Sequence, residues 1–160
     1  MDQLKRDELK KILDGYALKQ QQQTQQRDER RTELEKFLAG YIEAAQSIIK
    51  PAFEEFSAEL AQRGHPCTID MDKPANPNDS QTAAKITLTI FPNSATLTHG
   101  NPSLSYTASP NQRKVAAQRC TITSSGGITS SSVGEHTLEQ LTREVVDQHL
   151  FDLASSIFNQ

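Results

Sequence analysis

The amino-acid sequence predicts an α+β fold: a long N-terminal amphipathic helix, kinked or broken near Pro51, an antiparallel meander of four to five strands, and a C-terminal amphipathic helix packed on one sheet face. Three observations support this prediction. Apolar residues recur at helical spacing up to residue 62, alternate with polar residues from residue 67 onward, and return to helical spacing near the C-terminus. Helices that are segregated from strands along the chain are typical of α+β domains.

The strongest helical pattern spans residues 32–63. Leu34, Leu38 and Tyr41 are spaced four and three residues apart, and further apolar residues widen the stripe. A stripe of this breadth is suited to packing on a sheet. Pro51 lies inside the pattern, and because proline lacks the amide hydrogen that a helix interior needs, we expect a kink or a new helix start there.

Residues 1–31 are predicted to form a polar helical arm or a tether. Residues 19–31 contain no apolar side chain, so this part has no face to bury. Glutamine and arginine are good helix formers, and the sequence therefore leaves open whether residues 19–31 are helical or flexible. Before them, four apolar residues recur at helical spacing: Leu9, Ile12, Leu13 and Tyr16.

The remaining residues complete a single domain over residues 32–160. Alternation of apolar with polar residues predicts a sheet over residues 66–133, and the polar positions are rich in serine and threonine. One sheet face is therefore expected to be solvated or free to bind. A final helix is predicted over residues 137–158, because Thr137 and Gln140 fit a capping box and apolar residues follow at helical spacing.

Composition is consistent with one modest core and an extension. Apolar residues make up 35% of the chain, below the usual share of about 45–50%, and the shortfall lies in the arm. The charged N-terminus predicts no signal peptide, and no apolar run approaches the ~20 residues of a membrane span. Cys67 and Cys120 are too far apart in sequence to indicate a disulfide framework, so a cytoplasmic location is expected.

His149 is the candidate switch residue. At 100° per residue it falls within the apolar arc of the last helix, between Val145 and Leu153. A buried imidazole can act as a proton switch or as a ligand. A packed histidine with one hydrogen bond is the commoner outcome of the same pattern, since no second ligand is spaced with it on the helix.

No catalytic, cofactor or metal site is predicted. His99 and His136 lie in turn contexts near Cys120 and the serines of residues 130–132, but the sequence contains no nucleophile elbow. The glycine pair in this region lacks the Lys-Ser/Thr of a phosphate loop. Three acidic residues in a second region do not match the calcium-loop spacing: Asp70, Asp72 and Asp79.

The function that the sequence favours is a non-catalytic protein–protein interaction or oligomerisation module acting through its N-terminal helical arm. A small sheet does not cover the whole helical stripe, and an uncovered apolar stripe marks a partner site. The partner is expected to be a second copy, as in a homodimer, or another protein's helix. The interaction residues are predicted to be Leu9, Ile12, Leu13, Tyr16, Leu34, Leu38 and Tyr41.

The alternative is a small-ligand-binding or enzymatic domain that uses the polar sheet face and the loops at residues 73–82, 99–102 and 124–136. Nucleic-acid binding ranks last, because a few basic residues without interleaved aromatic residues form a weak footprint. Those basic residues are Lys85, Arg113, Lys114 and Arg119.

Overall fold

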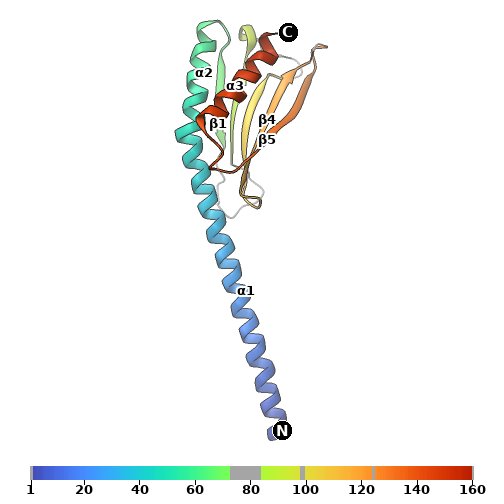
Figure 1. Cartoon of the computed structure of the whole chain (residues 1–160). Helices are drawn as coiled ribbons and strands as arrows, with labels where there is room; N and C mark the ends of the chain where they lie inside the picture. The colour runs from blue at the N-terminus through green and yellow to red at the C-terminus, as the bar shows by residue number, and fades with distance from the viewer. Residues whose placement is uncertain (1, 73–83, 98–99, 124, 160) are drawn as a thin grey trace.

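The structure is a computed structural model that describes residues 2–72, 84–97, 100–123 and 125–159 (Figure 1). It confirms the predicted α+β fold. In chain order its elements are α1 (Gln3–Ala44), the π-helical turn η1 (Ala45–Ile49), α2 (Lys50–Gln62), β1 (Cys67–Asp72), β2 (Lys85–Ile90), the 3-10 turn η2 (Pro92–Ser94), β3 (Ser103–Ser109), β4 (Lys114–Ile122), β5 (Ile128–His136) and α3 (Arg143–Phe158).

The sheet is an antiparallel meander in which the five strands lie in the order β1-β2-β3-β4-β5. The predicted alternation is clearest in β2, where Ile86, Leu88 and Ile90 are buried and the residues between them are half-buried. Figure 1 shows α2 and α3 on the same side of this sheet. The alternation therefore directs one side chain in two toward the helices, as the strand period requires.

The core lies between the helices and this face of the sheet. Tyr41, Ile49 and Phe53 enter it from the helical side, and Tyr106 and Val115 enter it from the strands. The rings of Phe53 and Tyr106 lie with their centroids 6.0 Å apart, within the range in which aromatic pairs attract. The core is thus formed by helices and strands together, so neither layer buries its apolar face without the other.

Helix α1 is longer than the predicted helix, because it starts at Gln3 instead of residue 32. Thr32, at the predicted helix start, lies in the helix interior, where its hydroxyl donates to the Asp28 carbonyl at 2.9 Å. Residues 19–31 are therefore helical. In Figure 1 the first part of α1 projects away from the domain as one rod.

The helical pattern changes just before Pro51. Residues Ala45–Ile49 form a π-helical turn, and α2 then begins at Lys50 with Pro51 in its first turn. Ile49 and Lys50 keep helical backbone angles, so α2 continues the helix without a gap. The kink or break that the sequence predicts near Pro51 therefore stays a prediction.

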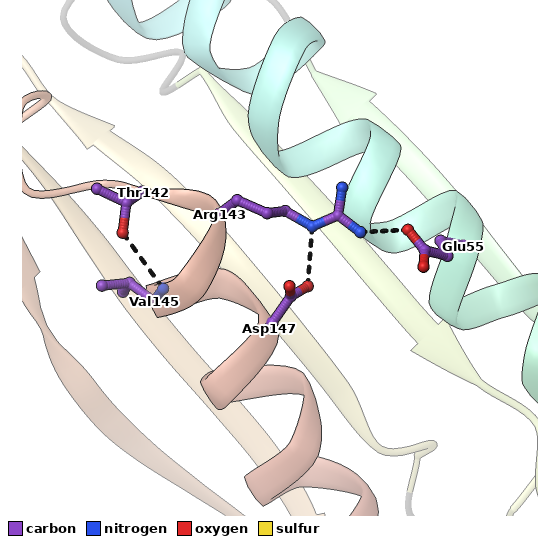
Figure 2. A network of polar contacts seen from close by, with 5 residues as sticks. All are labelled: Glu55, Thr142, Arg143, Val145 and Asp147. Carbon is purple, nitrogen blue, oxygen red and sulfur yellow. Dashed lines mark hydrogen bonds and ion pairs between the residues drawn. The ribbon is translucent and has the colours of Figure 1, made fainter.

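Helix α3 starts at Arg143, and the prediction of a start at residue 137 is wrong. The reciprocal bonds of a capping box do form, at 3.1 Å and 3.3 Å between Thr137 and Gln140, but they close a single turn. The chain is capped again at Thr142, whose hydroxyl accepts from the Val145 amide at 3.4 Å (Figure 2). The extra turn lets Leu141 reach the core, where it is buried.

The segment that precedes α3 has two further features. Strand β5 extends to His136, three residues beyond the predicted end of the sheet, since its residues still pair with β4. Leu138 packs against α1 at Gly40, where a Cβ atom would lie 2.8 Å from Leu138 Cδ1. Because Gly40 has no side chain, the connection into α3 can lie close to α1 at this point.

Candidate functional site

The arm, defined as residues 3–33 of α1, is exposed along its whole length. Large apolar side chains are nevertheless concentrated near its end. Soluble proteins keep such side chains scattered, and a cluster of them marks a contact surface. The exposed large apolar residues of the arm are Leu4, Leu9, Ile12, Leu13, Tyr16 and Leu18.

Four of these residues share one face of the helix. At 100° per residue, Leu9, Ile12, Leu13 and Tyr16 fall within an arc of about 100°. Leu18 lies on the opposite side, about 180° from Leu9, and Leu4 also falls outside the arc. We call the four residues the tip stripe. The predicted interaction surface is thus exposed and continuous at the tip of the arm.

The other predicted interaction residues are not free in the same way. Leu38 and Tyr41 are buried in the core of the chain itself, and Leu34 is half-buried. The sequence pattern does not separate them from the tip stripe, because both segments have the same helical spacing. The sheet covers only the second segment, so among the predicted interaction residues only those of the tip stripe are fully exposed to a partner.

The base of the arm is attached to the domain through a turn. Arg113, between β3 and β4, forms an ion pair with Glu33 and has a φ of 53°, in the left-handed region. A surface groove of about 750 Å³ lies beside this pair, between the arm and the turn. The ion pair is exposed, so we expect it to orient the arm more than to stabilise the fold.

A buried polar cluster lies on the helical side of the sheet. The Tyr106 hydroxyl lies 2.6 Å from Nδ1 of His149, and the Tyr41 hydroxyl donates to the Tyr106 carbonyl at 2.7 Å. The His136 ring lies 5.4 Å from the His149 ring, centroid to centroid. We call Tyr41, Tyr106, His136 and His149 the tyrosine–histidine cluster. It joins α1, β3, β5 and α3 at one point of the core.

The electrostatics of this cluster favour neutral side chains. Burial lowers the pKa of His149, and the nearby His136 and Arg119 lower it further, while Asp152 acts in the opposite direction. Burial raises the pKa of Tyr106, so this phenol stays protonated. The hydrogen bond therefore joins a protonated phenol to a neutral imidazole, and the tautomer of His149 decides which of the two groups donates.

The cluster is closed to solvent and is better suited to a structural role than to catalysis. His149 is only 8% exposed, so a substrate does not reach its ring. Among the described residues, Nε2 of His136 and Nε of Arg119 are buried without a hydrogen-bond partner. Buried polar atoms of this kind are costly, and they make the cluster sensitive to any added charge.

Acid is expected to destabilise the fold through His149. Its folded pKa lies below the unfolded value of about 6.5, so the unfolded chain binds the additional proton. The contribution of neutral His149 to the free energy of unfolding is present above pH ~6.5. It is lost as the pH falls toward the folded pKa, by at most about 1.4 kcal/mol per pH unit. Urea unfolding between pH 7.5 and 5 measures it. His149→Asn, which keeps an acceptor for Tyr106, should show a shallower pH dependence, and an unchanged slope would contradict the assignment.

Other sequence candidates do not come together into a site. His99, Asp79 and loop 73–82 lie outside the described residues. Asp70 and Asp72 are exposed on β1, and no group of three or more His, Cys, Asp or Glu residues in the described part of the chain could hold a metal ion. Cys67 is half-buried and packs against the core.

The four basic residues of the sheet region are spread over different surroundings. Arg113 pairs with Glu33, and Lys114 lies 4.0 Å from Glu135. Arg119 is directed toward the helical side, where it influences His149. These residues do not present one basic face.

Comparison of the chain with protein-family models, curated proteins and solved structures finds no match. Within the described ranges, none of the helices combines the length and the apolar character that crossing a bilayer requires. The tip stripe and the tyrosine–histidine cluster are therefore the two features of the described residues that bear on function.

Proposed function

We propose that this protein is a non-catalytic oligomerisation module that associates with a second copy of itself through its helical arm. The observation that carries this proposal is the tip stripe. Burying a Leu or Ile side chain that is otherwise exposed gives about 1.5–3 kcal/mol, so the three aliphatic residues of the tip stripe, together with Tyr16, offer a substantial gain on contact. A polar arm that only separated the domain from another element would need no apolar stripe at its tip.

The length of the arm supports the same proposal. Helices in proteins gain most of their stability from packing, and residues 2–33 bury no side chain in the single chain. A partner that covered the tip stripe would supply the missing contacts. A second copy is the partner we propose, because closed homodimers are the commonest assemblies and α3 carries acidic residues that complement the basic residues of the arm.

Replacing the centre of the tip stripe tests this proposal. The full chain is expected to sediment at tens of micromolar with about twice its monomer mass of 17.8 kDa. The double variant Ile12→Gln/Leu13→Gln is expected to sediment as a monomer, because glutamine removes the apolar contact and keeps a similar helix propensity. Analytical ultracentrifugation measures both masses.

The arm provides a matched control for this experiment. Leu4 and Leu18 are 70% and 56% exposed, and Ile12 and Leu13 are 68% and 56% exposed, but only the latter pair belongs to the tip stripe. Leu4→Gln/Leu18→Gln should therefore remain dimeric. A monomeric wild-type chain, or equal dissociation of the two double variants, would overturn the proposal.

A further inference from the structure

We propose that the tip stripe of one copy docks on the outer face of α3 of a second copy, and that two copies exchange arms reciprocally. This inference rests on the proposed self-association and adds the surface that receives the arm. It is carried by three properties of the chain: the charges that border the tip stripe, the chemistry of the α3 surface, and the length of the arm.

Basic residues border the tip stripe. On the helix, Arg6 and Lys10 lie beside Leu13, and Lys19 lies beside Tyr16, at spacings of three or seven residues. The acidic residues Asp7 and Asp14 lie on the opposite side of the helix, and Glu8 is the acid that borders the stripe. The stripe therefore needs a receiving surface with an apolar centre and acidic surroundings.

The outer face of α3 has this composition. Phe151 is 66% exposed and points away from the buried face formed by Val146, Leu150 and Leu153. An exposed phenylalanine in the middle of a helix is an apolar centre without a partner in the single chain. The acidic residues of this helix are Glu144, Asp147 and Asp152, and beyond Arg143 it contains no lysine or arginine.

The two ends of the acidic surface remain open to an incoming basic helix. Arg143 already binds Asp147 at 2.9 Å and also pairs with Glu55 of α2 (Figure 2). Asp152 is half-buried and accepts a neutral hydrogen bond from the Gln148 amide at 2.9 Å, and within the described part of the chain it forms no ion pair with a lysine or an arginine. Glu144 and Asp152 are therefore the charges that we expect the arm lysines to approach.

Pairing of two arms with each other is a poorer arrangement. The seam that contains Leu13 continues through Arg6, Gln20 and Arg27, so parallel arms would place arginine against arginine. Reversing one arm still leaves lysines on both borders of the stripe. Like charges at such positions are destabilising, whereas an acidic partner surface removes the conflict.

The dimensions of the chain fit a reciprocal exchange. Leu13 precedes Leu34 by 21 positions, and Glu55, beside which α3 begins, follows Leu34 by the same number. Each stretch is about 32 Å long at 1.5 Å per residue. If two copies align their long helices antiparallel, with the two-fold axis passing beside Leu34, residue 13 of one copy lies opposite residue 55 of the other. Leu13 of one copy is then level with the start of α3 of the other.

Charge reversal on both surfaces tests this arrangement. Lys10→Glu/Lys19→Glu and Glu144→Lys/Asp152→Lys should each weaken the dimer at least about tenfold in dissociation constant at low salt. Because each chain carries both surfaces, the fourfold variant should return to within about threefold of the wild type. Lys11→Glu changes the same charge on the far side of the arm and should have little effect. Sedimentation equilibrium measures all four, and circular dichroism checks that each is folded.

A carbodiimide cross-link gives a second measurement on the unmodified sequence. In a mixture of ¹⁴N- and ¹⁵N-labelled chains, mixed-isotope cross-links are expected between arm lysines and Glu144 or Asp152. Three results together would overturn the α3 site and leave the self-association intact. Ile12→Gln/Leu13→Gln would lose the dimer, Phe151→Gln would form a dimer as tight as that of the wild type, and no such cross-links would be found. A monomeric wild-type chain would overturn both.

Discussion

Replacing Phe53 with alanine is expected to lower the free energy of unfolding by about 3–5 kcal/mol. Phe53 is fully buried where α2 meets the sheet, and its ring contacts Tyr106. Alanine would leave a cavity that the strands cannot fill, because their paired backbones hold them in place. Urea unfolding followed by circular dichroism measures the change when the variant and the wild type are compared at one protein concentration, since self-association also contributes to the apparent stability.

An exposed apolar residue provides the control for this prediction. Leu4 is 70% exposed and lies outside the tip stripe, so Leu4→Ala should change the free energy of unfolding by less than about 0.5 kcal/mol. A cost at Phe53 no larger than the cost at Leu4 would mean that α2 does not pack on the sheet as described.

The variant Tyr106→Phe is expected to cost about 1–3 kcal/mol at neutral pH. The ring and its packing remain, but Nδ1 of His149 loses the hydroxyl that lies 2.6 Å away and stays buried without this partner. Loss of the hydrogen bond should also change the His149 pKa, upward if Tyr106 donates to Nδ1 and downward if it accepts from it. Urea unfolding at pH 7.5 gives the cost, and titration of the His149 ring by NMR gives the direction of the pKa change.

Tyr41→Phe separates these two effects. It also removes one buried hydroxyl, but the Tyr41 hydroxyl bonds to the Tyr106 carbonyl and not to the imidazole. Both variants should therefore be less stable, while only Tyr106→Phe should change the titration of His149. If Tyr41→Phe moved the His149 titration equally, the hydrogen bond from Tyr106 would not be its cause.

The strands could be predicted from the sequence because their period is two. In β2 each buried residue is followed by a half-buried one, and the same alternation places Tyr106 of β3 in the core. The helix starts were harder to predict. Thr137 and Gln140 make the bonds of a capping box and still do not begin a helix, since the position of Leu141 in the core decides where the chain turns.

The candidate sites show the same limit. Helical spacing identified Leu13 and Tyr41 together as interaction residues, but one is exposed and the other is buried, and only the position of the sheet separates them. The contact between Tyr106 and His149 joins residues 43 positions apart, and no local pattern predicts such a pair. The burial of His149 could be predicted from its place in the apolar arc, because that arc depends on local spacing alone, while its role as a switch stays a prediction.

The π-helical turn at Ala45–Ile49 has a consequence for the direction in which the arm faces. On a regular α-helix, Tyr41 and Phe53 would point about 120° apart, since twelve residues separate them. A π-helical turn takes up one additional residue, which reduces this angle to about 20° and brings both side chains onto the sheet. The additional residue of the π-helical turn also sets the rotation of the arm about its own axis. Deleting it would turn Leu13 by about 100° around the helix, so the direction of the tip stripe is fixed some thirty residues away from it.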